Sequence, residues 1–249
     1  MNVSNQAGFD FGQIKYRDVK SITSGVLQGK EIASGVQISI SKSLQFCPLT
    51  QQEIRHAARH YPIVFSPDDA PRPLAVFSLG AAQNQFVGDA GWVDQVYVPA
   101  AVRRYPFVMA KLEGSDDAVI AVDTAALEAT EGAGMRERMF NADGTQSDGY
   151  IEVANFCIGF HNDTVKTEEI CAELSRLSLF KTRAIRIRFT DGGHADTGQF
   201  RMIDEDALNA ASDKELGALI RSGAMALIYA HLASLDHIAR IGGAIVEPA

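Results

Sequence analysis

A histidine and an aspartate in a glycine-rich stretch have the spacing of a metal site. His194 and Asp196 form an H-x-D pair, and such a pair joined by a distal histidine is the facial triad of non-haem Fe(II) oxygenases. His231 or His237 could supply the third ligand, and Arg240 could hold the carboxylate of a co-substrate. However, both distal histidines fall in a predicted helix, whereas that class of fold takes its ligands from strands. The glycines around His194 also fit an ordinary turn, so the oxygenase is the alternative and not the favoured function.

Two further histidines could begin a zinc site. His56 and His60 are four residues apart, which on a helix places them on one face. Zinc needs three or four ligands, and the spacing nominates no third ligand. Positive charge is also favourable in the last turn of a helix, which would give the pair an ordinary structural role. The sequence therefore predicts no bound metal and no cofactor.

The richest candidate for ligand binding is the stretch GWVDQVYVPAAVRRYPFVMAKL, residues 91–112. Arginine pairs bind anions and carboxylates, and Trp or Tyr can stack on a flat ligand or a sugar. The alternative is that the aromatic residues are buried and an arginine neutralises buried carboxylates. The binding residues nominated by this stretch are Trp92, Tyr97, Arg103, Arg104 and Tyr105. No catalytic residue is nominated, because the chain has no P-loop, GxSxG or HExxH motif and no GxGxxG after a strand.

The two adjacent arginines in this stretch should have different surroundings. Pro99 suits the first turn of a short helix, and Pro106 would stop that helix. Neighbouring residues point about 100° apart on a helix and to opposite faces on a strand. We therefore expect one arginine to be partly buried against a carboxylate or carbonyls, and the other to face solvent or a ligand.

The net charge and the cysteines narrow the class of protein. A net charge of −8 argues against broad nucleic-acid binding and gives no attraction to anionic membranes. The most apolar stretch, residues 223–235, is too short to span a bilayer. The cysteines are odd in number without a CxxC pair, and the N-terminal residues do not have the pattern of a secretory signal. These features predict a soluble cytoplasmic protein without membrane insertion, with free thiols at Cys47, Cys157 and Cys171.

The order of elements predicts an α+β fold, with a mixed, mostly antiparallel sheet and a C-terminal amphipathic helical segment packed on it. Strands are expected at 35–46, 62–66, 73–80, 105–113, 117–123, 150–161, 183–189 and 198–204, with a turn-linked pair in 84–99. Helices are expected in 48–62, in 164–180 and from residue 212 onward. Capping boxes start the first and last helices, and Gly223 can split the last one. Residues 1–43 are expected to form a partly flexible arm with edge strands, and residues 44–249 a single domain.

Several blocks of the sequence resemble the SapC family of bacterial proteins. They are HYPIVFSP, NQFVGDAGWVDQVYVPAAVRRYPF, LFKTRAIRIRF, FRMIDEDALNA and ELGALIRSGAMALIYAHLASL. These blocks lie within residues 44–240 in the family's order, and YVPAAVRRYPF is the most specific of them. The family is distinct from the peptide-transport permease and the saposin of similar name. The resemblance implies a soluble accessory protein of a bacterial surface-layer or nutrient-uptake system, and it implies no catalytic residues.

Three functions are compatible with these observations. The first is a non-catalytic accessory or binding protein whose partner is a protein or a small ligand of a surface or uptake system. The second is an Fe(II) oxygenase using His194 and Asp196. The third is a structural component of the surface layer, although such chains are usually larger and richer in Thr and Gly. The lack of a catalytic motif favours the first function.

Overall fold

The chain forms two compact units in a computed structural model that describes residues 3–4, 14–78, 83–112, 117–132, 134–188, 194–243 and 245–247. Unit 1 comprises Met1–Ile40 and Ala100–Asn162, and unit 2 comprises Ser41–Pro99 and Asp163–Ala249. The fold is α+β with antiparallel sheets and a C-terminal helical segment, as predicted. The boundary predicted between residues 43 and 44 stays a prediction.

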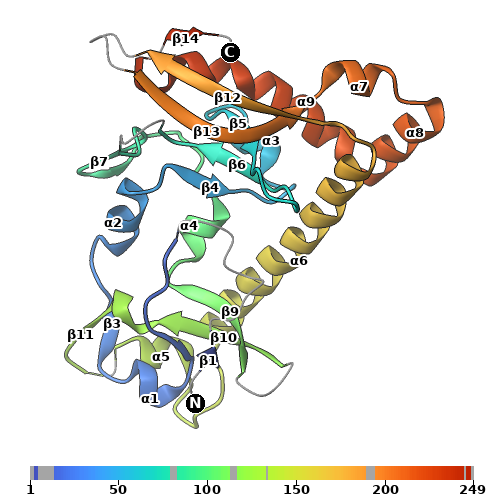
Figure 1. The fold of residues 1–249 in the computed structure, drawn as a ribbon. Helices are drawn as coiled ribbons and strands as arrows, with labels where there is room; N and C mark the ends of the chain where they lie inside the picture. Colours follow the sequence, from blue (N-terminus) through green and yellow to red (C-terminus); the bar gives the residue numbers. More distant parts are fainter. Residues whose placement is uncertain are drawn as a thin grey trace. The chain divides into compact units, whose positions relative to one another are not determined.

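Unit 1 is built on a four-stranded antiparallel sheet in the order β1-β9-β10-β2 (Figure 1). Its strands are β1 (Val3–Ser4), β2 (Val19–Ser21), β9 (Phe107–Leu112) and β10 (Ala118–Asp123). β9 and β10 pair from Phe107 opposite Val122 to Lys111 opposite Ala118, which confirms the predicted antiparallel pair. β1 and β2, which come from the N-terminal region, lie at the two edges of this sheet.

Short elements complete unit 1 around an apolar core. They are α1 (Ser24–Leu27), β3 (Lys30–Ile32), α4 (Ala100–Arg104), the 3-10 helix η1 (Thr124–Ala126), β11 (Leu127–Ala129) and α5 (Met135–Met139). β3 and β11 form a separate two-stranded antiparallel sheet. The buried core residues are Ile22, Leu27, Ile120, Val122, Met135, Met139 and Cys157. Because these residues come from distant parts of the sequence, the core joins both stretches of chain in unit 1.

The alternating residues at 36–40 form a helix, so the strand predicted over 35–46 is wrong. α2 spans Val36–Lys42, and β4 (Phe46–Pro48) begins only at the end of that range. Gly35 has a φ of 71°, which turns the chain immediately before the helix. Gln37 Nε2 then donates a hydrogen bond of 2.8 Å to the carbonyl of Tyr105. Such local geometry and tertiary contacts outweigh the context-dependent strand preference of a short β-branched pattern.

The longest element is α6, the 29-residue helix Asp148–Arg176. It confirms the helix predicted in 164–180 and shows that the strand predicted at 150–161 is wrong. Val153, Cys157 and Phe160 are buried or half-buried and recur at spacings of four and three residues, the period of a helix. Ile151 is exposed, as expected for a residue on another side of the helix. The strand was predicted because apolar and polar residues also alternate in part of this segment.

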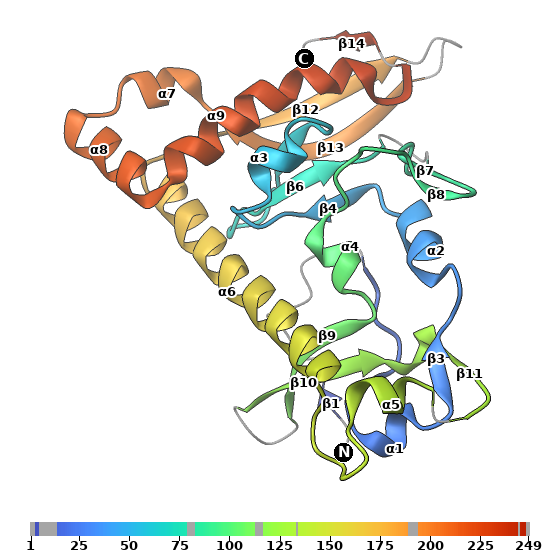
Figure 2. The ribbon, with the colours of Figure 1, turned by 180° about the vertical axis from the view of Figure 1, so that it is seen from behind.

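Unit 2 contains a six-stranded antiparallel sheet in the order β14-β12-β13-β5-β6-β4, seen from two sides in Figures 1 and 2. With β4, its strands are β5 (Ile63–Phe65), β6 (Pro73–Val76), β12 (Phe180–Arg188), β13 (His194–Ile203) and β14 (Ile245–Glu247). The strands predicted in 62–66, 73–80, 183–189 and 198–204 are confirmed within these bounds. The pairing of β12 and β13 shifts register between Ala184 and Arg186, which marks a β-bulge or similar irregularity.

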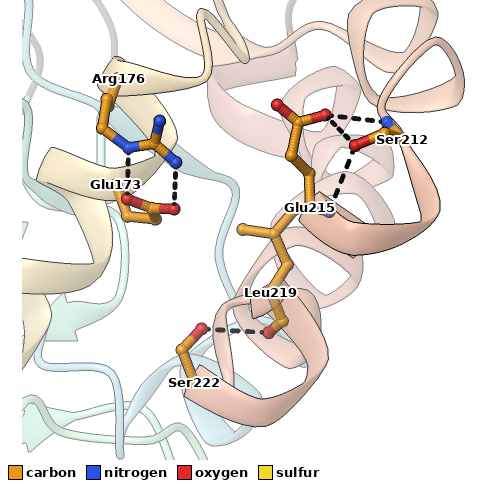
Figure 3. Close-up of polar contacts among 6 residues, drawn as sticks. All are labelled: Glu173, Arg176, Ser212, Glu215, Leu219 and Ser222. Atoms are coloured by element: carbon orange, nitrogen blue, oxygen red, sulfur yellow. Dashed lines mark hydrogen bonds and ion pairs between the residues drawn. The ribbon is translucent and has the colours of Figure 1, made fainter. Parts of the chain in front are cut away.

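Helices follow β13 in the chain, and Gly223 separates two of them as predicted. They are α7 (Glu205–Asn209), α8 (Asp213–Ser222), α9 (Ala224–Ser234) and the 3-10 helix η2 (Leu235–Gly243). Ser212 and Glu215 form the capping box, in which the Glu215 carboxylate accepts from the Ser212 N–H at 2.8 Å (Figure 3). Gly223, with a φ of 84°, ends α8 and separates it from α9. Ser234 Oγ accepts a hydrogen bond of 2.9 Å from the N–H of Ile63, which fixes α9 on β5.

The same segment contains α9, which is rich in apolar residues. Within the ranges that the structure describes, no single helix is both long and apolar enough to cross a membrane. Asp213–Ser222 and Ala224–Ile238 reach that length and composition only as a pair, which is bent by 87°.

Candidate ligand-binding site

Trp92 lies on a short hairpin and belongs to an aromatic cluster of unit 2. The hairpin consists of β7 (Val87–Gly88) and β8 (Gly91–Trp92), the turn-linked pair predicted in 84–99. The indole Nε1 donates a hydrogen bond of 3.2 Å to Ser41 Oγ, and the ring meets Phe77 edge-on with centroids 5.4 Å apart. Phe77 in turn packs edge-on against the fully buried Tyr61 at 4.9 Å. Trp92 is therefore half-buried with its polar atom bonded inside the unit.

Tyr97 is anchored by a buried carboxylate of the same unit. Its hydroxyl donates to Glu53 Oε1 at 3.0 Å, and its ring stacks on His56 with centroids 5.7 Å apart. Glu53 Oε2 also accepts from the N–H and the hydroxyl of Thr50, each at 3.0 Å. Thr50 and Glu53 are thus paired, but the predicted capping box is wrong, because α3 (Ile54–Ala57) begins only after Glu53 and its N-cap forms no side-chain hydrogen bond. This helix is only one turn long.

Because α3 is so short, the two histidines predicted to share its face have different neighbours. His56 stacks on Tyr97, whereas His60 follows the end of the helix. Burial, followed by the charges of His237 and Arg59, lowers the pKa of His60. Throughout the described ranges, no three His, Cys, Asp or Glu side chains gather as a set of metal ligands.

α4 presents the two consecutive arginines to different surroundings, as predicted. Arg103 is exposed, whereas Arg104 is only 5% exposed. Arg103 Cζ lies 5.4 Å from the ring centroid of Phe156, and Arg104 Cζ lies 4.5 Å from that of Phe160. These phenylalanines are four residues apart on α6 and so lie on one face of the helix. The strand predicted at 150–161 hid both phenylalanines as neighbours of the arginines, and the helical period of this segment is the signal that would have identified them.

The guanidinium of Arg104 forms few polar contacts that could offset the cost of burying its charge. Its Nη2 donates one long hydrogen bond of 3.4 Å to the hydroxyl of Tyr16, which itself donates to the carbonyl of Phe107 at 3.3 Å. The buried Nε has no hydrogen-bond partner, and no carboxylate in the described part of the chain forms an ion pair with Arg104. The prediction that the buried arginine lies against a carboxylate or carbonyls is therefore wrong. The aromatic faces of Phe160 and Tyr16, with centroids at 4.5 and 6.0 Å, take its place.

Tyr105 is a core residue of unit 1. Its hydroxyl donates to Asp123 Oδ2 at 3.1 Å, and burial followed by the Asp123 charge raises its pKa. Asp123 is fully buried and accepts further hydrogen bonds of 3.0 to 3.1 Å from the backbone N–H groups of Arg17, Asp18 and Ala125. Four donors thus hold this carboxylate at the end of β10. Asp123 could not be identified from the sequence, because it belongs to no motif and two of its donors, Arg17 and Asp18, lie far away in the chain.

The five nominated residues divide between the two units. Trp92 and Tyr97 belong to unit 2, and Arg103, Arg104 and Tyr105 belong to unit 1. Within unit 1, the charge of Arg104 is buried, and no residue in the described ranges forms an ion pair with it. The role of all five in binding stays a prediction.

The histidines of the oxygenase alternative occupy different places in unit 2. His194 and Asp196 lie on β13, and their side chains fall outside the described part of the structure. His231 is fully buried, and its Nε2 accepts a hydrogen bond of 3.2 Å from the N–H of Ile203. Its proton must therefore be on Nδ1, which donates to the carbonyl of Ile63 at 2.8 Å. A metal would need the lone pair on Nε2, which already accepts the hydrogen bond from Ile203. His231 therefore does not fit the role of third ligand.

The three cysteines are free, as predicted, and all three are buried. Burial raises the pKa of Cys157 to about 11, although the charge of Arg104 opposes this effect. Burial likewise raises the pKa of Cys171 to about 12, and the charge of Glu168 adds to the effect. Because only the thiolate is a strong nucleophile, neither of these thiols is suited to nucleophilic catalysis at neutral pH.

Comparison with known proteins gives a family but no characterised relative. The family model SapC matches residues 28–241. No curated protein and no solved structure matches the chain.

Proposed function

Because the chain belongs to the SapC family, we propose that it is a non-catalytic accessory protein that binds an anionic group through Arg104. The observation that carries this proposal is the buried guanidinium, whose Nε has no hydrogen-bond partner and which has no ion-pair partner in the described residues. The ligand is a small molecule or protein segment bearing a carboxylate or a phosphate. It belongs to a bacterial surface-layer or nutrient-uptake system, and the protein acts in the cytoplasm.

The permanent charge of arginine makes its burial costly. A guanidinium does not lose its proton in a protein, so burial cannot be relieved by neutralisation. The effective penalty for burying an ion is several kcal/mol. Contact with aromatic faces returns about 0.5–2 kcal/mol, and a hydrogen bond of 3.4 Å contributes little. An anion that accepts from Nε would provide the missing compensation.

The chemistry of the site limits the class of ligand. A guanidinium offers a planar fork of donors that matches the paired oxygens of a carboxylate or a phosphate. The neighbouring rings of Tyr16 and Phe160 favour an anion that is attached to an apolar or flat body. The net charge of −8 makes general attraction of anions weak, so a local cation must account for the binding.

The test compares the wild-type protein with Arg104→Met, which removes the charge and keeps an unbranched apolar side chain. Thermal and urea unfolding are measured in inorganic phosphate, succinate or chloride at equal ionic strength. Wild-type stability should rise with phosphate or with succinate, by about 2.7 kcal/mol at one hundred times the Kd. Arg104→Met should show no such rise, and without anion it should be at least as stable as the wild type.

Arg221→Met is the matched control, because Arg221 is exposed on α8 and should leave the anion response unchanged. The comparison of phosphate with succinate separates the two ligand chemistries. The proposal is overturned if neither anion stabilises the wild type, or if Arg104→Met responds as strongly as the wild type.

A further inference from the structure

One exposed face of α6 carries two rows of residues that repeat every seven positions. The first row is Ile151, Ile158 and Val165, which are 47%, 43% and 40% exposed. The second row lies one residue further along and consists of Glu152, Gly159 and Lys166, all exposed. Seven residues make nearly two helical turns, so each row runs along one side of the helix. All six residues belong to one unbroken helix, and helix geometry alone determines their spacing.

The apolar row has the pattern of a contact with a second helix. Exposed apolar residues scattered singly are ordinary on a protein surface, but three β-branched residues at a constant spacing of seven form a seam. Asn155 and Asn162 are exposed and lie between them at alternating spacings of four and three residues. Asparagines at such positions can pair by hydrogen bonds across a helix–helix contact and fix its register.

Gly159 is an independent sign that another helix approaches closely. A glycine in the interior of a helix is destabilising by about 0.5–1 kcal/mol relative to alanine. A Cβ atom added at Gly159 would meet nothing within 4 Å, so packing inside the described chain does not require a glycine there. A second backbone lying against this position would require it, because a Cβ atom would hold the two helices apart.

The charges on this face are complementary to those of an inverted copy of the same face. Glu152 and Lys166 each lie seven residues from Gly159, in opposite directions along α6. An antiparallel copy centred near Gly159 therefore places Glu152 opposite the partner's Lys166, and Lys166 opposite the partner's Glu152. Neither side chain forms an ion pair with any residue that the structure describes. A parallel copy would instead place like charges opposite each other.

We propose that this face of α6 is the interface of a two-fold symmetric homodimer in which two α6 helices pack antiparallel. The contact is isologous, with Gly159 near the symmetry axis, the apolar row and the asparagines beside it, and one ion pair at each end. A single pair of helices is a small interface, so the dissociation constant should be about micromolar. This proposal is independent of anion binding at Arg104, whose side chain faces Phe160 on a buried part of α6.

The experiment uses charge exchange and sedimentation equilibrium of the full chain over a wide range of concentration. Glu152→Lys and Lys166→Glu should each weaken dimerisation at least about tenfold, because each places like charges together at both ends. The double variant Glu152→Lys/Lys166→Glu should regain wild-type affinity, since both ion pairs are restored with the charges reversed. An equimolar mixture of the two single variants should form a heterodimer for the same reason.

Ile220→Glu is the control, because Ile220 is the most exposed of the large apolar residues that the structure describes and lies on α8. It should dimerise as the wild type does, and unchanged circular dichroism should show that every variant is folded. The proposal is overturned if the wild type is monomeric at all concentrations. It is also overturned if the single charge variants dimerise normally, as a parallel dimer would, or if the double variant is not restored. A monomer that instead co-sediments with phosphatidylglycerol vesicles would assign the face to lipid.

Discussion

The free energy of unfolding should decrease as the pH falls from 6.5 to 4, because His231 is buried in its neutral form. Its ring is fully buried between α9 and the sheet, with one nitrogen bonded to the Ile203 N–H, the other to the Ile63 carbonyl, and Phe65 edge-on at 5.0 Å. Burial lowers the pKa of His231 from its ordinary 6.5 to about 4, although the hydrogen bond to Ile63 opposes this change. The folded protein therefore keeps His231 neutral at pH values where the unfolded chain binds a proton.

The magnitude follows from the difference between these two pKa values. The interval from 6.5 to about 4, at about 1.36 kcal/mol per pH unit, corresponds to about 3 kcal/mol. Above pH 6.5 neither state binds the proton, so the full contribution to stability is present. As the pH falls toward 4 the unfolded state is protonated first, and the free energy of unfolding decreases; below about pH 4 both states are protonated and the loss stops.

Urea unfolding at several pH values between 7 and 4 measures this effect, with His231→Gln as the comparison. Glutamine can donate to one backbone partner and accept from the other, but it does not titrate. The variant should be less stable at pH 7 by about 1–3 kcal/mol, because its hydrogen bonds will be less well placed. Between pH 7 and 4 it should then lose about 3 kcal/mol less than the wild type. Other groups titrate alike in both proteins and cancel in the difference, so equal losses in the two proteins would refute the reasoning.

Three further predictions concern single side chains. Arg103→Ala should change stability by less than about 0.5 kcal/mol, whereas Arg104→Ala should cost about 2 kcal/mol through lost packing against the α6 aromatic face; equal thermal melts would contradict this. Tyr105→Phe should cost about 1–3 kcal/mol in urea unfolding, since it removes one of the four donors to the buried Asp123 carboxylate, and an unchanged stability would show that the bond matters little. Thiol titration after denaturation should find three thiols with or without reductant, and fewer without it would show a disulfide.

The elements that could be predicted are those specified by neighbouring residues. Ser212 and Glu215 lie three residues apart and start α8 by themselves, and Gly223 ends it through its left-handed backbone. The β9–β10 pair follows from two apolar runs and a short connection, which leaves only an antiparallel arrangement. The elements predicted wrongly are α2 and the first half of α6, where apolar residues fit a two-residue period about as well as a helical one. In both cases contacts with distant segments of the chain decide whether the segment forms a strand or a helix.

The candidate site was predictable only in part for the same reason. The different surroundings of Arg103 and Arg104 follow from helix geometry, because neighbouring side chains on a helix point in different directions. The aromatic partners of Arg104 come from Tyr16 and Phe160, and no local spacing connects residues so far apart. The same is true of Asp123, whose donors include the backbone of a segment more than a hundred residues earlier.

The most direct measurement of anion binding at Arg104 is anomalous diffraction from crystals soaked in selenate, a tetrahedral oxyanion like phosphate. We predict an anomalous peak beside the Arg104 guanidinium, with a selenate oxygen about 3 Å from the nitrogen Nε, which has no hydrogen-bond partner among the residues that the structure describes. The peak should be absent from crystals of Arg104→Met. Peaks that appear only at other positions, or a peak beside residue 104 that persists in the variant, would contradict the proposed function.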